Sequence, residues 1–192
     1  SADRRGDLEE SRRAALTAIG LDPRDAYAHY ALSGSALYLG LHEEALEAAQ
    51  RAVALNPNFA LGYARLGQVL TFVGRPQEAI APIQRSLRHS PFDPQQGAIL
   101  ASLSLAYYQL GDYVEAAAQA RASLQHDPQI GLAVLAAALA RLGRFDEVER
   151  LISAEVRQRL FRGSLRMVAF ANEADRTHYV EGLKLAGMMA AA

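Results

Sequence analysis

Residues 111–128, GDYVEAAAQARASLQHDP, decide the fold of this chain. The stretch begins at the helix-breaking Gly111, continues as an alanine-rich helix and ends at Asp127-Pro128. Gly ends helices, and Pro disfavours helix in the residue before it. Similar stretches begin at Gly40 (GLHEEALEAAQRAVALNP), Gly74 (GRPQEAIAPIQRSLRHSP) and, less closely, Gly143 (GRFDEVERLISAEV). The chain is therefore predicted to be a repeat array.

The composition favours closely packed helices. The 192 residues are 51% hydrophobic and 21% charged, which indicates a packed core rather than disorder. Alanine supplies much of the apolar content. The formal net charge of -1 gives no global attraction to nucleic acid or to an anionic membrane, so neither is expected as a partner. The lack of cysteine excludes disulfides and cysteine-ligated metals.

Helix pairs are expected between the glycine and proline stops. Asp25, Asn58 and Asp93 are the expected N-caps, and Pro76 and Pro94 are expected at first helical positions. The expected helices span 7–20, 25–39, 43–55, 59–73, 76–89, 95–110, 113–126, 130–142, 145–156 and 173–186, with one short helix after residue 164. The predicted array covers 1–156, with a half repeat at 7–23, units at about 25–57, 59–91, 94–128 and 129–156, and an irregular C-terminal cap at 157–192.

The spacing of small residues resembles that of tetratricopeptide repeats. Gly74 follows Gly40 by 34 residues, with two helices in each unit. Small residues recur in the first helix (Ser33, Gly67, Ser104, Ala136), in the facing helix (Ala45, Ala79, Ala116, then Val148) and near its end (Ala52, Ser86, Ser123, then Glu155). The closing Pro recurs at 23, 57, 91 and 128, and large residues recur at Leu32, Leu66, Leu103 and Tyr63. The resemblance implies an all-α, right-handed α-solenoid of about three and a half units with a C-terminal capping helix.

The C-terminal segment carries a narrower resemblance. SPFDP, LAYYQLGDYVEAA and the final AFANEADRTHYVEGLKLAG look like the repeat region of bacterial multidomain signalling proteins. The matching tail positions are Phe170, Tyr179, Gly182, Leu183, Lys184, Ala186 and Gly187, while Glu173 replaces the usual Pro and Lys184-Leu185 replaces Arg-Lys. In such proteins the repeats follow a class III adenylate or guanylate cyclase domain or a winged-helix domain. The resemblance implies a cytoplasmic, non-catalytic regulatory region. Because the chain opens inside a half repeat without an initiator Met, we expect it to be part of a longer protein.

In such arrays the first helices of successive units line a concave groove that commonly holds a peptide. The register predicts these groove residues: Tyr27, Tyr30, Tyr38, Leu61, Gln68, Phe72, Leu105, Tyr108, Gln109 and Arg141. The predicted groove is aromatic and nearly uncharged. It lacks the Lys, Arg and Asn pattern by which one subfamily clamps a terminal carboxylate. An apolar peptide or a helix, from a partner protein or from another part of the parent protein, is the expected ligand.

Three alternatives for the groove stay open. The tyrosines are expected to pack within the array if no groove is open. The C-terminal helix is another candidate occupant, if it folds back. A second copy of the chain is the third, because an apolar face of the half repeat favours self-association into a homodimer.

No residue pattern points to catalysis, a cofactor or a metal. The five histidines are widely spaced and form no i, i+4 pair, and phosphate-binding and nucleophile motifs are missing. The basic cluster Arg157, Arg159, Arg162 and Arg166 has no aromatic platform, so a solvated helix face is the preferred interpretation over a phosphate contact. The chain itself is therefore predicted to be non-catalytic, whether or not the parent protein is a nucleotide cyclase.

Overall fold

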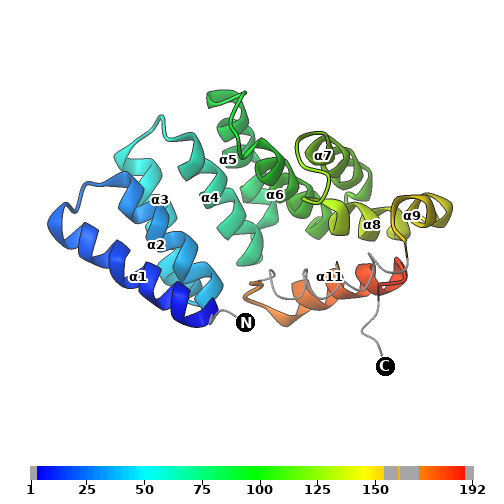
Figure 1. Ribbon diagram of the computed structural model, residues 1–192, viewed down its shortest axis with the longest axis horizontal. Coiled ribbons are helices and arrows are strands. Elements are labelled where there is room, and N and C mark those ends of the chain that lie inside the picture. Colours follow the sequence, from blue (N-terminus) through cyan, green and yellow to red (C-terminus); the bar gives the residue numbers. More distant parts are fainter. Residues whose placement is uncertain (1–3, 154–159, 161–168, 189–192) are drawn as a thin grey trace.

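The computed structural model describes residues 4–153, 160 and 169–188, which fold as an all-α solenoid of antiparallel helix pairs. Neighbouring helices pack in chain order from α1 to α9, and α11 folds back against α8 and α6 (Figure 1). The helices in this part of the chain are α1 (Arg4–Leu21), α2 (Ala26–Leu39), α3 (His42–Leu55), α4 (Ala60–Phe72), α5 (Pro76–His89), α6 (Gln96–Gln109), α7 (Tyr113–His126), α8 (Leu132–Arg141), α9 (Phe145–Leu151) and α11 (Glu173–Leu185). The predicted fold class is confirmed.

Most helices begin and end near the Asp, Pro and Gly residues that the sequence predicts as caps and stops. The Asp25 carboxylate accepts from the backbone N–H groups of Tyr27 and Ala28, so Asp25 caps α2 as predicted. Pro76 occupies the first position of α5, where its missing N–H leaves no bond unmade. The glycines that end the first helices, Gly40, Gly74, Gly111 and Gly143, have φ between 72 and 81°, a left-handed conformation that other residues rarely adopt.

Two predicted caps are wrong, for the same physical reason. The Asn56 side chain accepts from Asn58 N–H in a local turn, and α4 begins one residue later, after Phe59, without a side-chain cap. Asp93 accepts from Gln95 N–H, which closes the turn of the link, and α6 begins only at Gln96. In both links a short polar side chain, that of Asn56 or of Asp93, accepts from the N–H group two residues later, and this N–H group belongs to the turn.

The second helix of the fourth unit is shorter than predicted. Helix α9 ends at Leu151, and Ile152 is extended and buried, where the sequence predicts helix as far as 156. The predicted third small position at 155, the arginine cluster at 157–166 and the short helix after 164 lie outside the described residues. No helix in the described part of the chain is both long and apolar enough to cross a membrane.

The small residues lie where the two helices of each unit cross. Ser33 Oγ donates to Ala45 O at 2.8 Å, and Ser104 Oγ donates to Ala116 O at 2.7 Å; each pair is separated by 12 residues. Gly67 holds the same position in the second unit, where a Cβ would lie 2.8 Å from Ala79 O. These contacts bring the helix backbones together, so the predicted spacing has a direct steric cause.

Gly67→Ala tests this crossing. The added Cβ would lie 2.3 Å from Ile83 Cγ1 and 2.8 Å from a backbone oxygen, so the pair must separate. We expect urea unfolding to show a loss of about 1–3 kcal/mol in the free energy of unfolding. Gly20→Ala is the matched control, because Gly20 is also helical and has nothing within 4 Å of an added Cβ. The control should be neutral or stabilising by up to about 1 kcal/mol, and equal effects of the two changes would contradict the crossing model.

Candidate functional site

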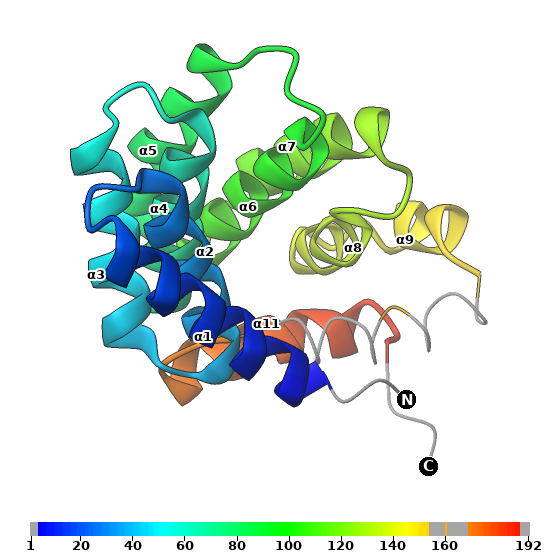
Figure 2. The same ribbon diagram turned by 60° about the vertical axis from the view of Figure 1, so that its left-hand side comes forward.

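The predicted groove residues lie on α2, α4, α6 and α8, the first helices of the successive units. The structure divides them into two groups, which we call the covered half and the N-terminal half of the groove. The covered half comprises Phe72, Leu105, Tyr108, Gln109 and Arg141, against which α11 and the strap at 169–172 pack. Figure 2 shows α11 lying along one side of the curved array. The fold-back of the C-terminal helix, left open by the sequence, is the arrangement found.

Tyr108 is the centre of the covered half. Its side chain is fully buried, and its hydroxyl donates to the backbone oxygen of His178 at 3.2 Å. The Tyr108 ring stacks on the His178 ring with 5.0 Å between centroids and meets the Tyr179 ring edge-on at 5.7 Å. A Cβ at Gly182 would lie 1.8 Å from Tyr108 Oη, so α11 approaches this closely only because residue 182 has no side chain.

His178 inserts between two polar partners. Its Nδ1 lies 3.2 Å from Gln109 Oε1, and its Nε2 lies 2.9 Å from Tyr113 Oη. Since Gln109 Oε1 only accepts, the matching neutral tautomer donates from Nδ1 and accepts the Tyr113 hydroxyl proton at Nε2. Burial, followed by the charge of Arg141, lowers the pKa of His178.

Arg141 ties the end of α8 to α11. Its Nη2 donates to His178 O at 3.0 Å and to the Glu181 carboxylate at 3.2 Å. Its Nε donates to Tyr108 Oη at 3.4 Å. An arginine of the groove thus donates hydrogen bonds to both a carboxylate and a backbone oxygen of the helix that lies against it.

The strap extends these contacts to α4. Ala171 N–H donates to Phe72 O at 2.8 Å, and the rings of Phe170 and Phe72 lie 5.0 Å apart. A ring nitrogen of His42 lies 2.8 Å from Ala169 O. The predicted residue Phe72 therefore faces a segment of its own chain.

The N-terminal half contains Tyr27, Tyr30, Tyr38 and Gln68, and it is more polar than the sequence indicates. Tyr27 is 61% exposed and forms an aromatic cluster with Tyr30 and Phe59. Gln68 donates to Tyr38 Oη at 3.3 Å. Leu61 is half-buried against the core between α4, α5 and α6, so it contributes mainly to packing.

Sequence reasoning missed four site residues: Phe59, Arg65, Tyr113 and His178. Arg65 lies three positions before Gln68, and this helical spacing places both residues on one face. The helical periodicity of the sequence could therefore have identified Arg65 as a groove residue. His178 and Tyr113 gave no signal, because their contact depends on where α11 docks. Among the described residues, no group of three or more His, Asp or Glu side chains is arranged to hold a metal ion.

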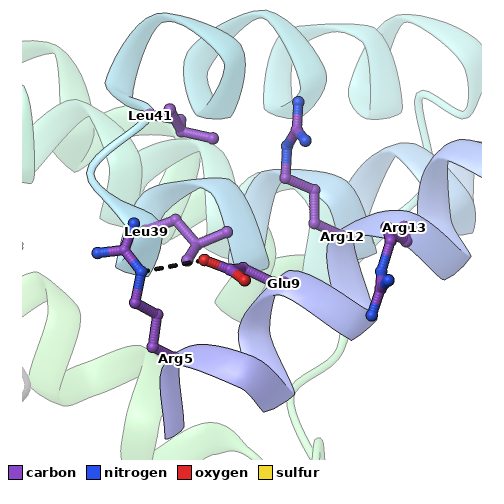
Figure 3. A pocket seen from close by; sticks show the side chains of 6 residues that line it. All are labelled: Arg5, Glu9, Arg12, Arg13, Leu39 and Leu41. Carbon is purple, nitrogen blue, oxygen red and sulfur yellow. Dashed lines mark hydrogen bonds and ion pairs between the residues drawn. The ribbon is translucent and has the colours of Figure 1, made fainter.

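The hollows that described residues line include two beside the first repeats. One, of about 380 Å³, lies between α1 and the end of α2 and contains none of the predicted groove residues (Figure 3). Arg5 pairs with Glu9 there at 3.0 Å, and Arg12 pairs with Glu44 at 2.6 Å. The other, of about 460 Å³, lies between the turns before α2 and α4 and is lined in part by Tyr27 and Phe59. The second hollow therefore adjoins the N-terminal half of the groove.

Comparison with known proteins agrees with this architecture. A family model described as Tetratricopeptide repeat matches residues 1–60 and 64–129. The structure of PilW, a type IV pilus biogenesis factor, is similar with a TM-score of 0.71 and 18% identity over 93% of this chain and 86% of that chain. TTC0263, a thermophilic repeat protein of Thermus thermophilus, gives a TM-score of 0.66 and 22% identity over 93% and 92%. YrrB, described as a TPR protein with an unusual peptide-binding site, gives 0.60 and 18% over 90% of each chain. No curated protein sequence matches.

Acidification is expected to loosen α11. The docked His178 has a lowered pKa, so undocked His178 binds a proton more readily, despite the nearby Asp175 and Glu181 that oppose the shift. Docking is then strongest above the ordinary histidine pKa of about 6.5 and weakens as the pH falls below it. Hydrogen-exchange protection factors of the α11 amides should therefore fall when the pH is lowered from about 7 to about 5.

His178→Gln supplies the control, because glutamine keeps polar groups but does not titrate. In this variant the protection of α11 should no longer change between pH values of about 7 and 5. An unchanged pH dependence in His178→Gln would show that another group is responsible.

Proposed function

Because the chain belongs to the tetratricopeptide repeat family, we propose that it is a protein-interaction module whose groove binds an amphipathic helix or an apolar segment of a partner protein. Proteins of this family generally mediate contacts between proteins. The family fold is typically non-catalytic, and the binding role needs no catalytic group. The predicted groove residues are the proposed contact set.

The observation that carries the proposal is the binding of α11 itself. This helix contributes Tyr179 and Leu183, which are 3% and 0% exposed, to a core shared with Tyr108 and Leu135. Residues 179, 183 and 186 follow the i, i+4, i+7 spacing with which a helix fills a groove. The array therefore already holds a ligand of the proposed chemical class, supplied by the same chain.

A partner helix can bind the covered half of the groove only in exchange for α11. A partner helix that uses Tyr108 and Arg141 must replace α11, and its affinity is reduced by the free energy of α11 docking. Such an arrangement suits a regulatory region.

The residue pattern of the tail supports the finer proposal that the parent is a cytoplasmic bacterial signalling protein. Docking of α11 into another copy, or of another domain of the parent into the groove, uses the same contacts and would give a homodimer or an internal switch.

Gly182→Leu in the full chain tests the exchange. The new side chain collides with Tyr108 and should release α11 while the helix pairs α1 to α7 stay folded. We expect a fluorescent peptide of residues 169–188 to bind this variant at least about tenfold more tightly than the wild type, because the released site no longer competes. Fluorescence anisotropy measures both affinities.

Two controls accompany this measurement. Ala174→Leu, at an exposed position of the same helix, should leave the affinity at the wild-type level. A peptide carrying Leu183→Asp should bind neither protein. Failure of the wild-type peptide to bind a folded Gly182→Leu chain, with α11 shown to be undocked by hydrogen exchange, would contradict the proposed function.

A further inference from the structure

Arg65 is a cation in the N-terminal half of the groove that lacks an acidic partner among the described residues. Arg65 takes part in none of the ion pairs between described residues. Its Nη1 donates to Gln68 Oε1, and its Nη2 donates to Tyr30 Oη at 3.4 Å. Its Nε is buried without a hydrogen-bond partner. A carboxylate supplied by a ligand would give this partly buried charge the counter-ion that the described residues do not supply.

The guanidinium is held in place rather than free in solvent. It lies over the Tyr30 ring, with Cζ 4.9 Å from the centroid, and it rests on the α2 backbone at Gly34. A Cβ at Gly34 would lie 3.1 Å from Nη2 and 3.2 Å from Cζ. Contacts from α2 and from Gln68 on its own helix α4 thus fix one position for the charge. A planar guanidinium held in this way loses little further freedom when it binds a carboxylate.

The covered half shows what such an arginine binds. Arg141 donates to the hydroxyl of a groove tyrosine at 3.4 Å, the same distance at which Arg65 donates to Tyr30. Arg141 has in addition the Glu181 carboxylate of α11 at 3.2 Å. Each arginine donates to a tyrosine hydroxyl of the preceding first helix, Arg65 through Nη2 and Arg141 through Nε, and of the two only Arg141, which faces α11, has a carboxylate among the described residues.

We propose that Arg65 selects the partner of the N-terminal half of the groove by pairing with an acidic side chain on an amphipathic helix of that partner, as Arg141 pairs with Glu181. The inference rests on the proposed function of the groove. Apolar contact comes from the cluster of Tyr27, Tyr30 and Phe59, where Tyr27 is 61% exposed. The partner helix is therefore acidic and apolar, and a basic helix is rejected by charge.

A peptide selection on the full chain tests this assignment. Helix-forming peptides are displayed on phage, with apolar residues fixed at the spacing of Tyr179, Leu183 and Ala186 and with Asp, Asn, Lys or Ala at the polar positions. The immobilised targets are the wild type, Arg65→Gln and Arg65→Glu. We expect the wild type to enrich Asp at one polar position, Arg65→Gln to lose this preference, and Arg65→Glu to enrich Lys there.

A double-mutant cycle then measures the pair. Arg65→Gln should weaken the best wild-type peptide by about ten- to a hundredfold, the range for a charge-assisted bond. Replacing its selected Asp by Asn should cost a similar factor on the wild type and little more on Arg65→Gln. Arg51→Gln, an equal change of charge at an exposed site outside the groove helices, should leave the affinity unchanged.

The outcomes separate the two proposals. If all three targets enrich the same peptides, the groove binds peptides but Arg65 does not select them, which overturns this inference alone. If the wild type enriches no peptide over the bare support, both this inference and the proposed function fall. Circular dichroism shows whether each variant is folded, and the cycle with Arg65→Gln decides the matter if Arg65→Glu is not.

Discussion

Close contact between two helix backbones in each of three units is the constraint on which the rest of the structure depends. The crossing is made by Ser33 with Ala45, by Gly67 with Ala79 and by Ser104 with Ala116, and the side chains at these positions are buried. Two serines use the short distance to donate to a carbonyl oxygen across the crossing, and the glycine has no side chain at all. The second helices thereby hold the first helices side by side, which places their remaining faces along one groove.

The covered half of the groove is shaped by α11 as much as by the first helices that line it. Tyr108 and Gly182 fit together so closely that the tyrosine hydroxyl fills the space of a missing side chain. His178, Arg141 and Gln109 then satisfy the polar atoms that this contact buries. The C-terminal segment includes Phe170, Tyr179, Gly182, Leu183 and Ala186. All of these face the array or pack against it. These five residues are therefore among those through which α11 and the strap dock onto the array of their own chain.

Sequence reasoning identified the local structure better than the site. Helix pairs, the Asp25 cap and the crossing residues depend on spacing along the chain, and these predictions are confirmed. The predicted caps at Asn58 and Asp93 are wrong because the side chains of Asn56 and Asp93 close turns in these links, and each helix begins further on. The fold-back of the C-terminal helix into the groove was one of three alternatives that the sequence left open. It depends on contacts such as those of Gln109 and Tyr113 with His178, which lie 69 and 65 residues apart in the chain. Periodicity carries no information at that separation.

Nuclear Overhauser effects between the ring protons of Tyr108 and His178 test the central claim, that α11 occupies the groove of its own chain, most directly. The ring centroids lie 5.0 Å apart, so a chain with labelled tyrosine and histidine should give cross-peaks between these rings. The account predicts that these cross-peaks persist on dilution and arise within one molecule. Their absence, or their appearance only between differently labelled copies, would contradict an intramolecular occupant.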